Sequence, residues 1–196
     1  MPDLTRLGET RWLHEVFATL RHATVPDSLT RLECLRDRVM PLAWADGAPR
    51  ACSFVSADEH DRFRRHPLAS VEALDCAALL MYWPPGHATV PHDHGGLWGI
   101  ELVVDGALSV NEFVRIGEGD RSTLVPTRSM QLGVGDAALF HSDNYIHRCR
   151  NLSNVTPTLT LHVYGGVLTD YNAYTPDAPG RFSWSRQIAR EDHRLS

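Results

Sequence analysis

The spacing of apolar residues changes about one third of the way along the chain. In the first third they recur every three or four positions, which is typical of the buried face of a helix. The residues with this spacing are Trp12, Val16, Phe17, Leu20, Leu29, Leu32, Leu35 and Val39. Ser56 and Glu59 form a capping box, which predicts a further short helix. That helix should end near His66, because Pro67 disfavours helical geometry in the residue before it.

From about residue 69 the apolar residues occur in short runs rich in valine, leucine and aromatic side chains. The runs cover residues 76–83, 97–104, 107–116, 137–140 and 158–164. Turn signals such as Asp105-Gly106 separate them. Many short strands at regular spacing predict a β-sandwich or barrel. We therefore expect a single domain over residues 1–196, with a helical part (1–67), a β-barrel (68–170) and a polar tail (171–196).

Composition and charge narrow the class of protein. A chain of 196 residues is long enough for a self-sufficient core. The formal net charge of −5 argues against nucleic acid or an anionic membrane surface as a partner, since both need a basic face. No apolar run approaches the roughly 20 residues of a membrane span, and the start lacks the apolar core of a signal peptide.

The four cysteines are far apart in the sequence and form no C-x-x-C pair. Cys34 and Cys76 have apolar neighbours, so we expect both to be buried. These features together predict a reduced, cytoplasmic protein. The sequence gives no indication of its oligomeric state.

Three of the eleven histidines are candidates for a metal site. His92 and His94 are separated by one residue, so in a strand their side chains share one face and Asp93 takes the other. Two imidazoles placed in this way inside a barrel can reach the same ion. His147 follows later, in a strand-like segment after a turn, and offers a third nitrogen donor.

These histidines lie in segments that resemble the two motifs of the cupins. The motif residues are Gly86, His92, Asp93, His94, Gly106, His147 and Asn151. More narrowly, residues 82–94 resemble the iron site of the thiol dioxygenases, which include the cysteine dioxygenases and bacterial enzymes acting on 3-mercaptopropionate. The likeness covers residues 63–166. It implies a mainly β fold, a cupin double-stranded β-helix (jelly-roll barrel) with N-terminal helices, in which His92, His94 and His147 hold Fe²⁺.

The first motif departs from the usual cupin pattern in one position. Most cupins carry a carboxylate five residues after the second histidine, and cysteine dioxygenases of the animal type carry a cysteine there. This chain has Gly99 instead, so it resembles the bacterial-type members, which lack the tyrosine–cysteine crosslink. Glu101 lies two places further on, and we do not expect it to be a ligand. Three imidazoles leave three octahedral positions of an iron ion for the substrate and O₂.

A later run carries polar residues at alternate positions. Thr160, His162 and Tyr164 share one face of residues 158–164, whereas the other face is apolar. Such a strand can simply be half exposed, with its polar face in water. The resemblance implies instead the Ser-His-Tyr relay of thiol dioxygenases, with threonine in place of serine. Tyr164 would then meet the substrate or oxygen, His162 would orient Tyr164, and Thr160 would fix the tautomer of His162.

The resemblance also assigns residues to the substrate. It places Trp83 in the pocket and Arg65 at the position that contacts the substrate carboxylate. A guanidinium suits a carboxylate because it offers two parallel donors. Arg64 is the alternative to Arg65, and both arginines can also be a solvated helix end.

The function favoured by these residues is that of a thiol dioxygenase, with a small carboxylate-bearing thiol and O₂ as its partners and a sulfinic acid as its product. Arg65 favours L-cysteine as the thiol. Gly99 and Gly165-Gly166 favour 3-mercaptopropionate or another acidic thiol such as mercaptosuccinate. A non-oxidative metal-binding cupin, acting as an isomerase or a small-molecule sensor, is the alternative that three histidines leave open.

Overall fold

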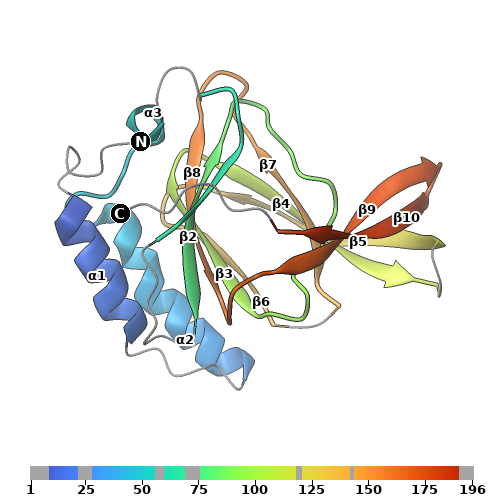
Figure 1. Cartoon of the computed structure of the whole chain (residues 1–196), viewed down its shortest axis with the longest axis horizontal. Helices are drawn as coiled ribbons and strands as arrows, with labels where there is room; N and C mark the ends of the chain where they lie inside the picture. Colours follow the sequence, from blue (N-terminus) through green and yellow to red (C-terminus); the bar gives the residue numbers. More distant parts are fainter. Residues whose placement is uncertain are drawn as a thin grey trace.

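Two five-stranded antiparallel sheets form the centre of the molecule (Figure 1). The computed structural model describes residues 9–21, 28–55, 60–68, 76–117, 121–141 and 144–189. The first sheet contains, in spatial order, β1 (Arg64–Pro67), β2 (Ala77–Trp83), β8 (Thr158–Tyr164), β3 (Gly99–Asp105) and β6 (Ala137–Phe140). The second contains β7 (Ile146–Asn151), β4 (Leu108–Ile116), β5 (Arg121–Leu132), β10 (Arg181–Ile188) and β9 (Asp170–Ala178).

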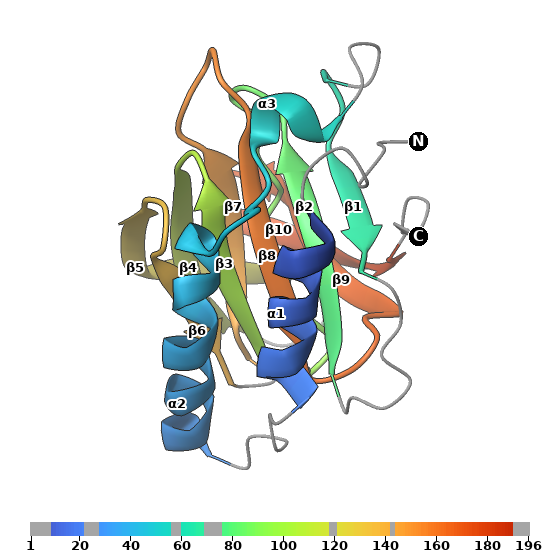
Figure 2. The ribbon, with the colours of Figure 1, turned by 90° about the vertical axis from the view of Figure 1, so that its left-hand side faces the viewer.

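Helices cover the outer face of the first sheet (Figure 2). They are α1 (Glu9–Arg21), α2 (Leu29–Val39), the 3₁₀ helix η2 (Met40–Trp44) and the short α3 (Ala51–Phe54). The two long helices predicted from the apolar spacing are confirmed, and Ser28 caps α2 by accepting a hydrogen bond from the backbone N–H of Arg31. Trp12 ties α1 to η2, because its indole N–H donates to the carbonyl oxygen of Leu42 at 2.8 Å.

Two hydrophobic clusters occupy the two sides of the first sheet. The outer cluster packs Trp12, Val16 and Leu20 of the helices against Leu159 and Leu161 of β8, together with other apolar residues of the same face. The inner cluster lies between the sheets. Because strand side chains alternate between faces, β2, β8, β3 and β6 each supply residues to both clusters. The site described below lies on the inner side.

The segment around Arg65 is a strand, where the sequence predicted the end of a helix. Arg65 pairs with Met81 of β2, and Leu68 donates its backbone N–H to the carbonyl oxygen of Ala78. The predicted capping residues 56–59 lie outside the described residues. Pro67 is compatible with the strand because β1 is an edge strand, where a missing N–H leaves no ladder bond unmade. Pairing with a partner distant in sequence overrides the local helix signal.

The expected polar tail is mostly a β-hairpin. Strands β9 and β10 pair with each other, and β10 continues onto β5 through Phe182 and Ser183. The turn between them uses Gly180, whose φ of 73° is unfavourable for other residues. Phe182 and Trp184 pack against the cluster of Leu124, Ile146 and Tyr174, so alternate apolar residues give the hairpin a partly buried side. The second sheet therefore extends beyond the boundary predicted at residue 170.

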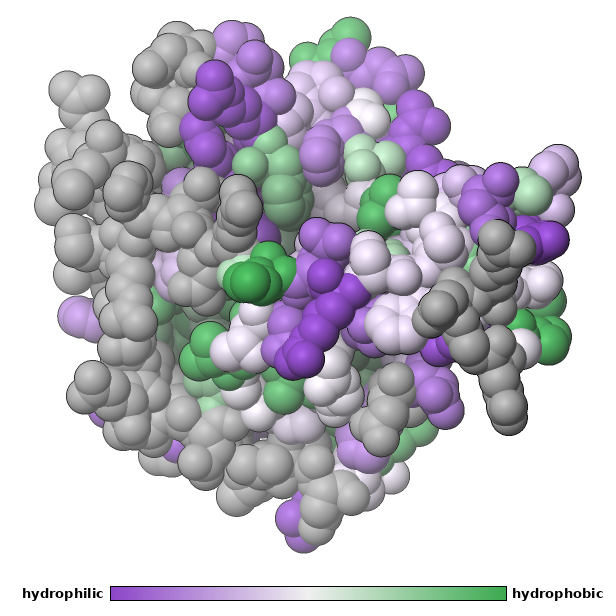
Figure 3. All heavy atoms as spheres, turned by 45° about the vertical axis from the view of Figure 1, so that its right-hand side comes forward, coloured by the Kyte–Doolittle hydropathy of each residue, from purple (hydrophilic) through white to green (hydrophobic). Residues whose placement is uncertain are grey.

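Two cysteines, the apolar surface residues and the helices were compared with the expectations from the sequence. Cys34 is exposed and Cys76 is partly buried, so the prediction of burial was wrong for Cys34. In the coloured part of Figure 3, apolar residues form small groups separated by polar ones. None of the described helices has the length and hydropathy that crossing a membrane requires.

Candidate metal centre

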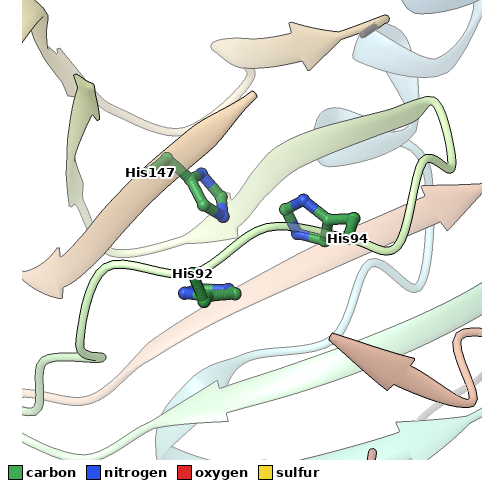
Figure 4. A group of neighbouring side chains, drawn as sticks. All are labelled: His92, His94 and His147. Atoms are coloured by element: carbon green, nitrogen blue, oxygen red, sulfur yellow. The ribbon is translucent and has the colours of Figure 1, made fainter. Parts of the chain in front are cut away.

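Three histidine rings meet in the space between the sheets (Figure 4). His147 comes from β7, whereas His92 and His94 come from the connection between β2 and β3. One nitrogen from each ring lies within 4.8 Å of the other two. The ring centres are 4.7 Å apart for His92 and His147, 4.7 Å for His94 and His147, and 5.3 Å for His92 and His94.

The segment that carries His92 and His94 is extended but is not part of a regular strand. His92 forms isolated bridges with His147 and with Ala173 of β9, and it exchanges backbone hydrogen bonds of 2.9 and 3.0 Å with His147. The two side chains still point to the same side, as the one-residue spacing predicted. The segment with His92 and His94 thus lies between β7 and β9.

Asp93, between the two histidines, fastens this segment to the C-terminal hairpin. Its carboxylate accepts hydrogen bonds from the backbone N–H of Gly95 at 3.1 Å and from the backbone and side chain of Asn172 at 3.0 and 2.8 Å. Tyr174 adds a backbone bond to the carbonyl oxygen of Pro91 at 2.8 Å. Sequence reasoning identified no role for Asp93, because its partners lie in a region predicted to be a tail.

The hydrogen bonds of the rings leave nitrogen lone pairs available. His92 Nδ1 lies 2.9 Å from the carbonyl oxygen of Val90, which can only accept, so Nδ1 carries the proton and Nε2 a lone pair. His94 Nδ1 and His147 Nε2 are buried, and neither has a hydrogen-bond partner among the described residues. Burial lowers the pKa of His94 and of His147 well below the usual value, so both are neutral at neutral pH. Buried, neutral imidazole nitrogens without partners fit a divalent transition-metal ion.

A chain of hydrogen bonds runs beside the histidines on the inner face of β8. The indole N–H of Trp83 donates to Thr160 Oγ1 at 2.8 Å, and Thr160 Oγ1 lies 2.8 Å from His162 Nε2. His162 Nδ1 lies 3.1 Å from the hydroxyl of Tyr164. An indole can only donate, so Thr160 Oγ1 accepts from Trp83. For the threonine proton, Nε2 at 2.8 Å is a nearer acceptor than the carbonyl oxygen of Met81 at 3.5 Å, and with the proton directed to Nε2, Nδ1 donates to the phenol oxygen. This direction leaves the proton of Tyr164 for a group in the cavity.

Burial excludes the alternative that the polar face of β8 lies in water. Thr160, His162 and Tyr164 are at most 2% exposed. Burial lowers the pKa of His162 to about 3 and raises the pKa of Tyr164, so the imidazole and the phenol are both uncharged. Burial is the main cause of the lowered pKa of His162, and the positive charge of Arg65 is the second. The guanidinium therefore acts electrostatically on this hydrogen-bond chain.

A cavity of about 270 Å³ connects these groups. Arg65 and Trp83 line it, together with His92, His94, His162 and Tyr164. Arg65 pairs with Met81, whose side chain belongs to the inner cluster, whereas Arg64 pairs with Tyr82 of the outer cluster. The structure therefore places Arg65 at the cavity and Arg64 on the other face of β1.

Several lining residues were not identified from the sequence. His87 lines the cavity and stacks on Phe63 with ring centres 4.8 Å apart, and Tyr171 of β9 meets His92 edge to face at 5.6 Å. The position of His87 directly after Gly86 of the motif was an available signal. Tyr171 offered none, because only the pairing of β9 brings it to the site.

Gly99 is required by its surroundings. A Cβ atom at this position would collide with the ring of Phe140 on the neighbouring strand β6. That ring stacks on His94, with centres 4.1 Å apart and planes 14° apart. The space that a ligand from position 99 would need is therefore filled by an aromatic side chain.

Glu101 lies one inward-facing position further along β3 and lines the cavity. Its carboxyl group is buried, with Oε1 3.6 Å from His147 Nε2 and 3.4 Å from His162 Nδ1. The thiol of Cys149 lies 3.6 Å from Oε2. Burial raises the pKa of Glu101 to about 8. A residue not expected to take part in metal binding thus lies between the histidine group and the hydrogen-bond chain.

A two-sheet barrel with a histidine triad inside it defines a metal-binding cupin, the fold class that the sequence predicted. The chain belongs to the family described as cysteine dioxygenase type I, whose model matches residues 40–177. It is therefore a member of a dioxygenase family that acts on small molecules. None of the curated proteins compared with the chain matches it.

Several solved structures resemble the chain at low sequence identity. The cupin domain of Schizosaccharomyces pombe Cnp3 is 8% identical with a TM-score of 0.42, over 54% of this chain and 61% of that one. An oxalate oxidase in complex with glycolate is 18% identical with a TM-score of 0.41, over 57% of this chain and 53% of that one. A cupin superfamily protein from Desulfitobacterium hafniense is 12% identical with a TM-score of 0.40, over 58% and 84%.

Proposed function

We propose that this chain is a non-haem iron thiol dioxygenase that converts a small carboxylate-bearing thiol, L-cysteine above all, into its sulfinic acid. The observation that carries the proposal is the buried hydrogen-bond chain that ends at Tyr164 in the same cavity as the histidine group. A metal ion with a purely structural role has no use for a directed phenol. Membership of the cysteine dioxygenase type I family supports the same function.

His92, His94 and His147 would hold Fe²⁺ through neutral nitrogens. When bound, ferrous iron supplies an acceptor for the substrate thiolate and the electrons that activate O₂. The overall reaction, RSH + O₂ → RSO₂H, places both oxygen atoms on sulfur and needs no external reductant. The partners are therefore a thiol and O₂ alone.

Arg65 would bind the carboxylate of the substrate. Its guanidinium offers two parallel donors, and the cavity wall around it includes the apolar side chains of Met81, Leu168 and Phe63. In such a partly dry site, a charge-assisted pair is stronger than in water. This contact orients the thiol relative to the histidines.

Tyr164 would donate a hydrogen bond to the reacting oxygen or sulfur. Because burial raises the pKa of Tyr164, the phenol keeps its proton at neutral pH and acts as a donor. His162 and Thr160 position the phenol rather than touch the substrate. Trp83 makes the first bond of this hydrogen-bond chain by donating to Thr160.

A cytoplasmic location suits this chemistry. None of the four cysteines forms a disulfide bond, and a reducing compartment keeps both thiols and ferrous iron in the required state.

The proposal is tested with protein purified without oxygen and loaded separately with Fe²⁺, Zn²⁺, Ni²⁺ or Mn²⁺. Each form is given L-cysteine, 3-mercaptopropionate, mercaptosuccinate and cysteamine in an oxygen electrode, and sulfinate is measured by mass spectrometry. We expect one O₂ consumed per sulfinate formed, with Fe²⁺ only, and L-cysteine as the best substrate. A better rate with 3-mercaptopropionate or mercaptosuccinate would revise the substrate, whereas no uptake with any thiol would identify a non-oxidative cupin.

A further inference from the structure

A second group of metal-donor side chains lies beside the cavity and shares one residue with the histidine group. It consists of Glu101, His147 and Cys149, and one donor atom from each lies within 4.8 Å of the other two. Glu101 and Cys149 line the cavity, and all three side chains are at most 2% exposed. The proposed dioxygenase chemistry uses His147 but leaves the carboxyl group and the thiol without a role.

Distances within this group match those between the ligands of one ion. Cys149 Sγ lies 3.6 Å from His147 Nδ1 and 3.6 Å from Glu101 Oε2. The carboxyl and imidazole groups also lie 3.6 Å apart, between Oε1 and Nε2. A tetrahedral zinc ion, with bonds of about 2.3 Å to sulfur and about 2.0–2.2 Å to nitrogen or oxygen, places its donors roughly 3.4–3.6 Å apart. Thiol, imidazole and carboxyl groups are also the donor types that zinc binds in proteins.

Strand geometry brings the three donors together. His147 and Cys149 are separated by one residue on β7, so their side chains share one face. Glu101 comes from β3 of the other sheet, where it pairs with His162 of β8. An ion at this place would therefore join the two sheets in the interior of the barrel.

His147 can serve one ion at a time. A neutral imidazole carries its proton on one nitrogen and its free lone pair on the other. With the proton on Nδ1, the lone pair of Nε2 is available for an ion held with His92 and His94, and Nε2 has no hydrogen-bond partner among the described residues. With the proton on Nε2, the lone pair of Nδ1 is available beside the thiol of Cys149. The tautomer of His147 thus decides which of the two groups is complete.

We propose that Glu101, His147 and Cys149 form a second metal site, which binds a thiophilic divalent ion such as Zn²⁺ and thereby withdraws His147 from the histidine group. Cys149 gives the site its preference, because thiolate ligands select zinc. On binding, the thiol releases its proton to solvent. The site does not depend on the reaction that the chain catalyses. Only the loss of dioxygenase activity in the zinc-bound form rests on the proposed function.

The site is tested by titrating apo-protein with Co²⁺ in the absence of thiol substrates and O₂. A thiolate bound to Co²⁺ gives an intense near-ultraviolet charge-transfer band, which imidazole and carboxylate ligands do not give. His92→Ala breaks the histidine group and leaves the second group whole, so this variant should bind one Co²⁺ per chain and show the band. Adding Cys149→Ser should abolish the band. Adding Glu101→Gln instead should lower the Co²⁺ affinity at least about 10-fold, since even partners outside the ligand set contribute that much.

Cys34→Ser in the same His92→Ala background is the matched control. It makes the same chemical change at an exposed cysteine of α2, so the band should persist. Far-ultraviolet circular dichroism checks that each variant is folded. A folded His92→Ala protein without the band would overturn the proposal, and so would a band that survives Cys149→Ser. An unchanged Co²⁺ affinity in the variant with Glu101→Gln would overturn it independently of Cys149.

The competition with iron has its own readout. Wild-type protein equilibrated without oxygen in equal concentrations of Fe²⁺ and Zn²⁺ should hold mainly zinc and no more than one ion per chain, measured by elemental analysis. Cys149→Ser should lower the zinc-to-iron ratio at least about 10-fold, because the donor that favours zinc is lost. An unchanged ratio would overturn the zinc preference, and one ion of each metal in the same chain would overturn the exclusion of iron. None of these measurements requires a thiol to be oxidised, so a failure of the proposed function is seen separately.

Discussion

The two faces of strand β8 are equally buried and have opposite chemistry. Leu159, Leu161 and Val163 face the helices and belong to the outer cluster, each 0% exposed. The alternate residues point to the inside of the barrel with a hydroxyl, an imidazole and a phenol, and the imidazole and the phenol line the cavity. Burial alone therefore does not distinguish a residue that stabilises the fold from one that serves the site.

The energetics of the two faces differ in kind. A fully buried leucine or valine stabilises the folded state by about 1.5–3 kcal/mol, because its apolar surface is removed from water. A buried polar group contributes only about 0.5–1.5 kcal/mol when it is hydrogen-bonded, and it costs about 1–3 kcal/mol when it is not. The polar residues of the inner face are thus tolerated in the interior because a continuous hydrogen-bond chain satisfies them. Their contribution is to the chemistry of the site rather than to stability. Substitutions on the two faces should separate stability from function.

The largest effect is expected for the histidine group. Replacing His92, His94 or His147 singly with Ala should remove most bound iron and all detectable turnover, while the far-ultraviolet circular dichroism stays that of a folded protein. His141→Ala, at an exposed histidine, should keep both iron and activity. Metal content by elemental analysis is the measurement, and full iron in any one of the three variants would exclude that histidine as a ligand.

The second largest effect is expected on the stability of the fold, from a substitution on the outer face of β8. Leu161→Ala should lower the free energy of unfolding by about 2–5 kcal/mol, because it opens a cavity between β8 and the helices. The folded, iron-loaded variant should keep its kcat. Denaturant unfolding and steady-state kinetics on the same preparation measure both, with the volume-conserving Leu161→Met, expected to cost under about 1.5 kcal/mol, as the comparison. A large loss of kcat in Leu161→Ala would mean that the two faces are coupled.

The two arginines of the edge strand β1 allow the same comparison between an inner and an outer face. Arg65→Ala should lower kcat/KM for L-cysteine and for 3-mercaptopropionate. The loss of transition-state binding should be about 2–4 kcal/mol, because a substrate carboxylate loses a charge-assisted bidentate partner. Cysteamine, which has no carboxylate, should be nearly unaffected. Arg64→Ala changes the opposite face and should leave all three substrates unchanged. A selective loss in Arg64→Ala instead would contradict the pairing of β1 with β2.

The smallest change is the removal of one hydroxyl. Tyr164→Phe should keep the iron content and lower kcat by roughly 10- to 1000-fold, the range for a positioned donor. Tyr82→Phe removes a hydroxyl from the outer face, where it donates to the carbonyl oxygen of His60, and should leave kcat unchanged. His162→Asn should act like Tyr164→Phe by misorienting the phenol. Unchanged turnover in both inner-face variants would reduce the hydrogen-bond chain to a structural feature.

The sequence by itself determined the features that depend on local periodicity. Helical spacing identified α1 and α2, and strict alternation separated the two faces of β8 before any contact was known. The one-residue spacing of His92 and His94 gave two donors on one side, and His147 stood in a strand-like segment. These patterns are reliable because neighbouring side chains are related by the geometry of the backbone alone.

The tertiary structure decided everything that depends on pairing between distant segments. The segment around Arg65 became a strand because β2 offers it a partner, and that pairing turned Arg65 and not Arg64 toward the cavity. The tail became the hairpin that fastens Asp93 through Asn172. Glu101 reached His147 because β3, β7 and β8 converge there, a relation that no spacing along the chain encodes. Such contacts arise from the register of strands far apart in sequence, which is fixed only when the whole barrel packs.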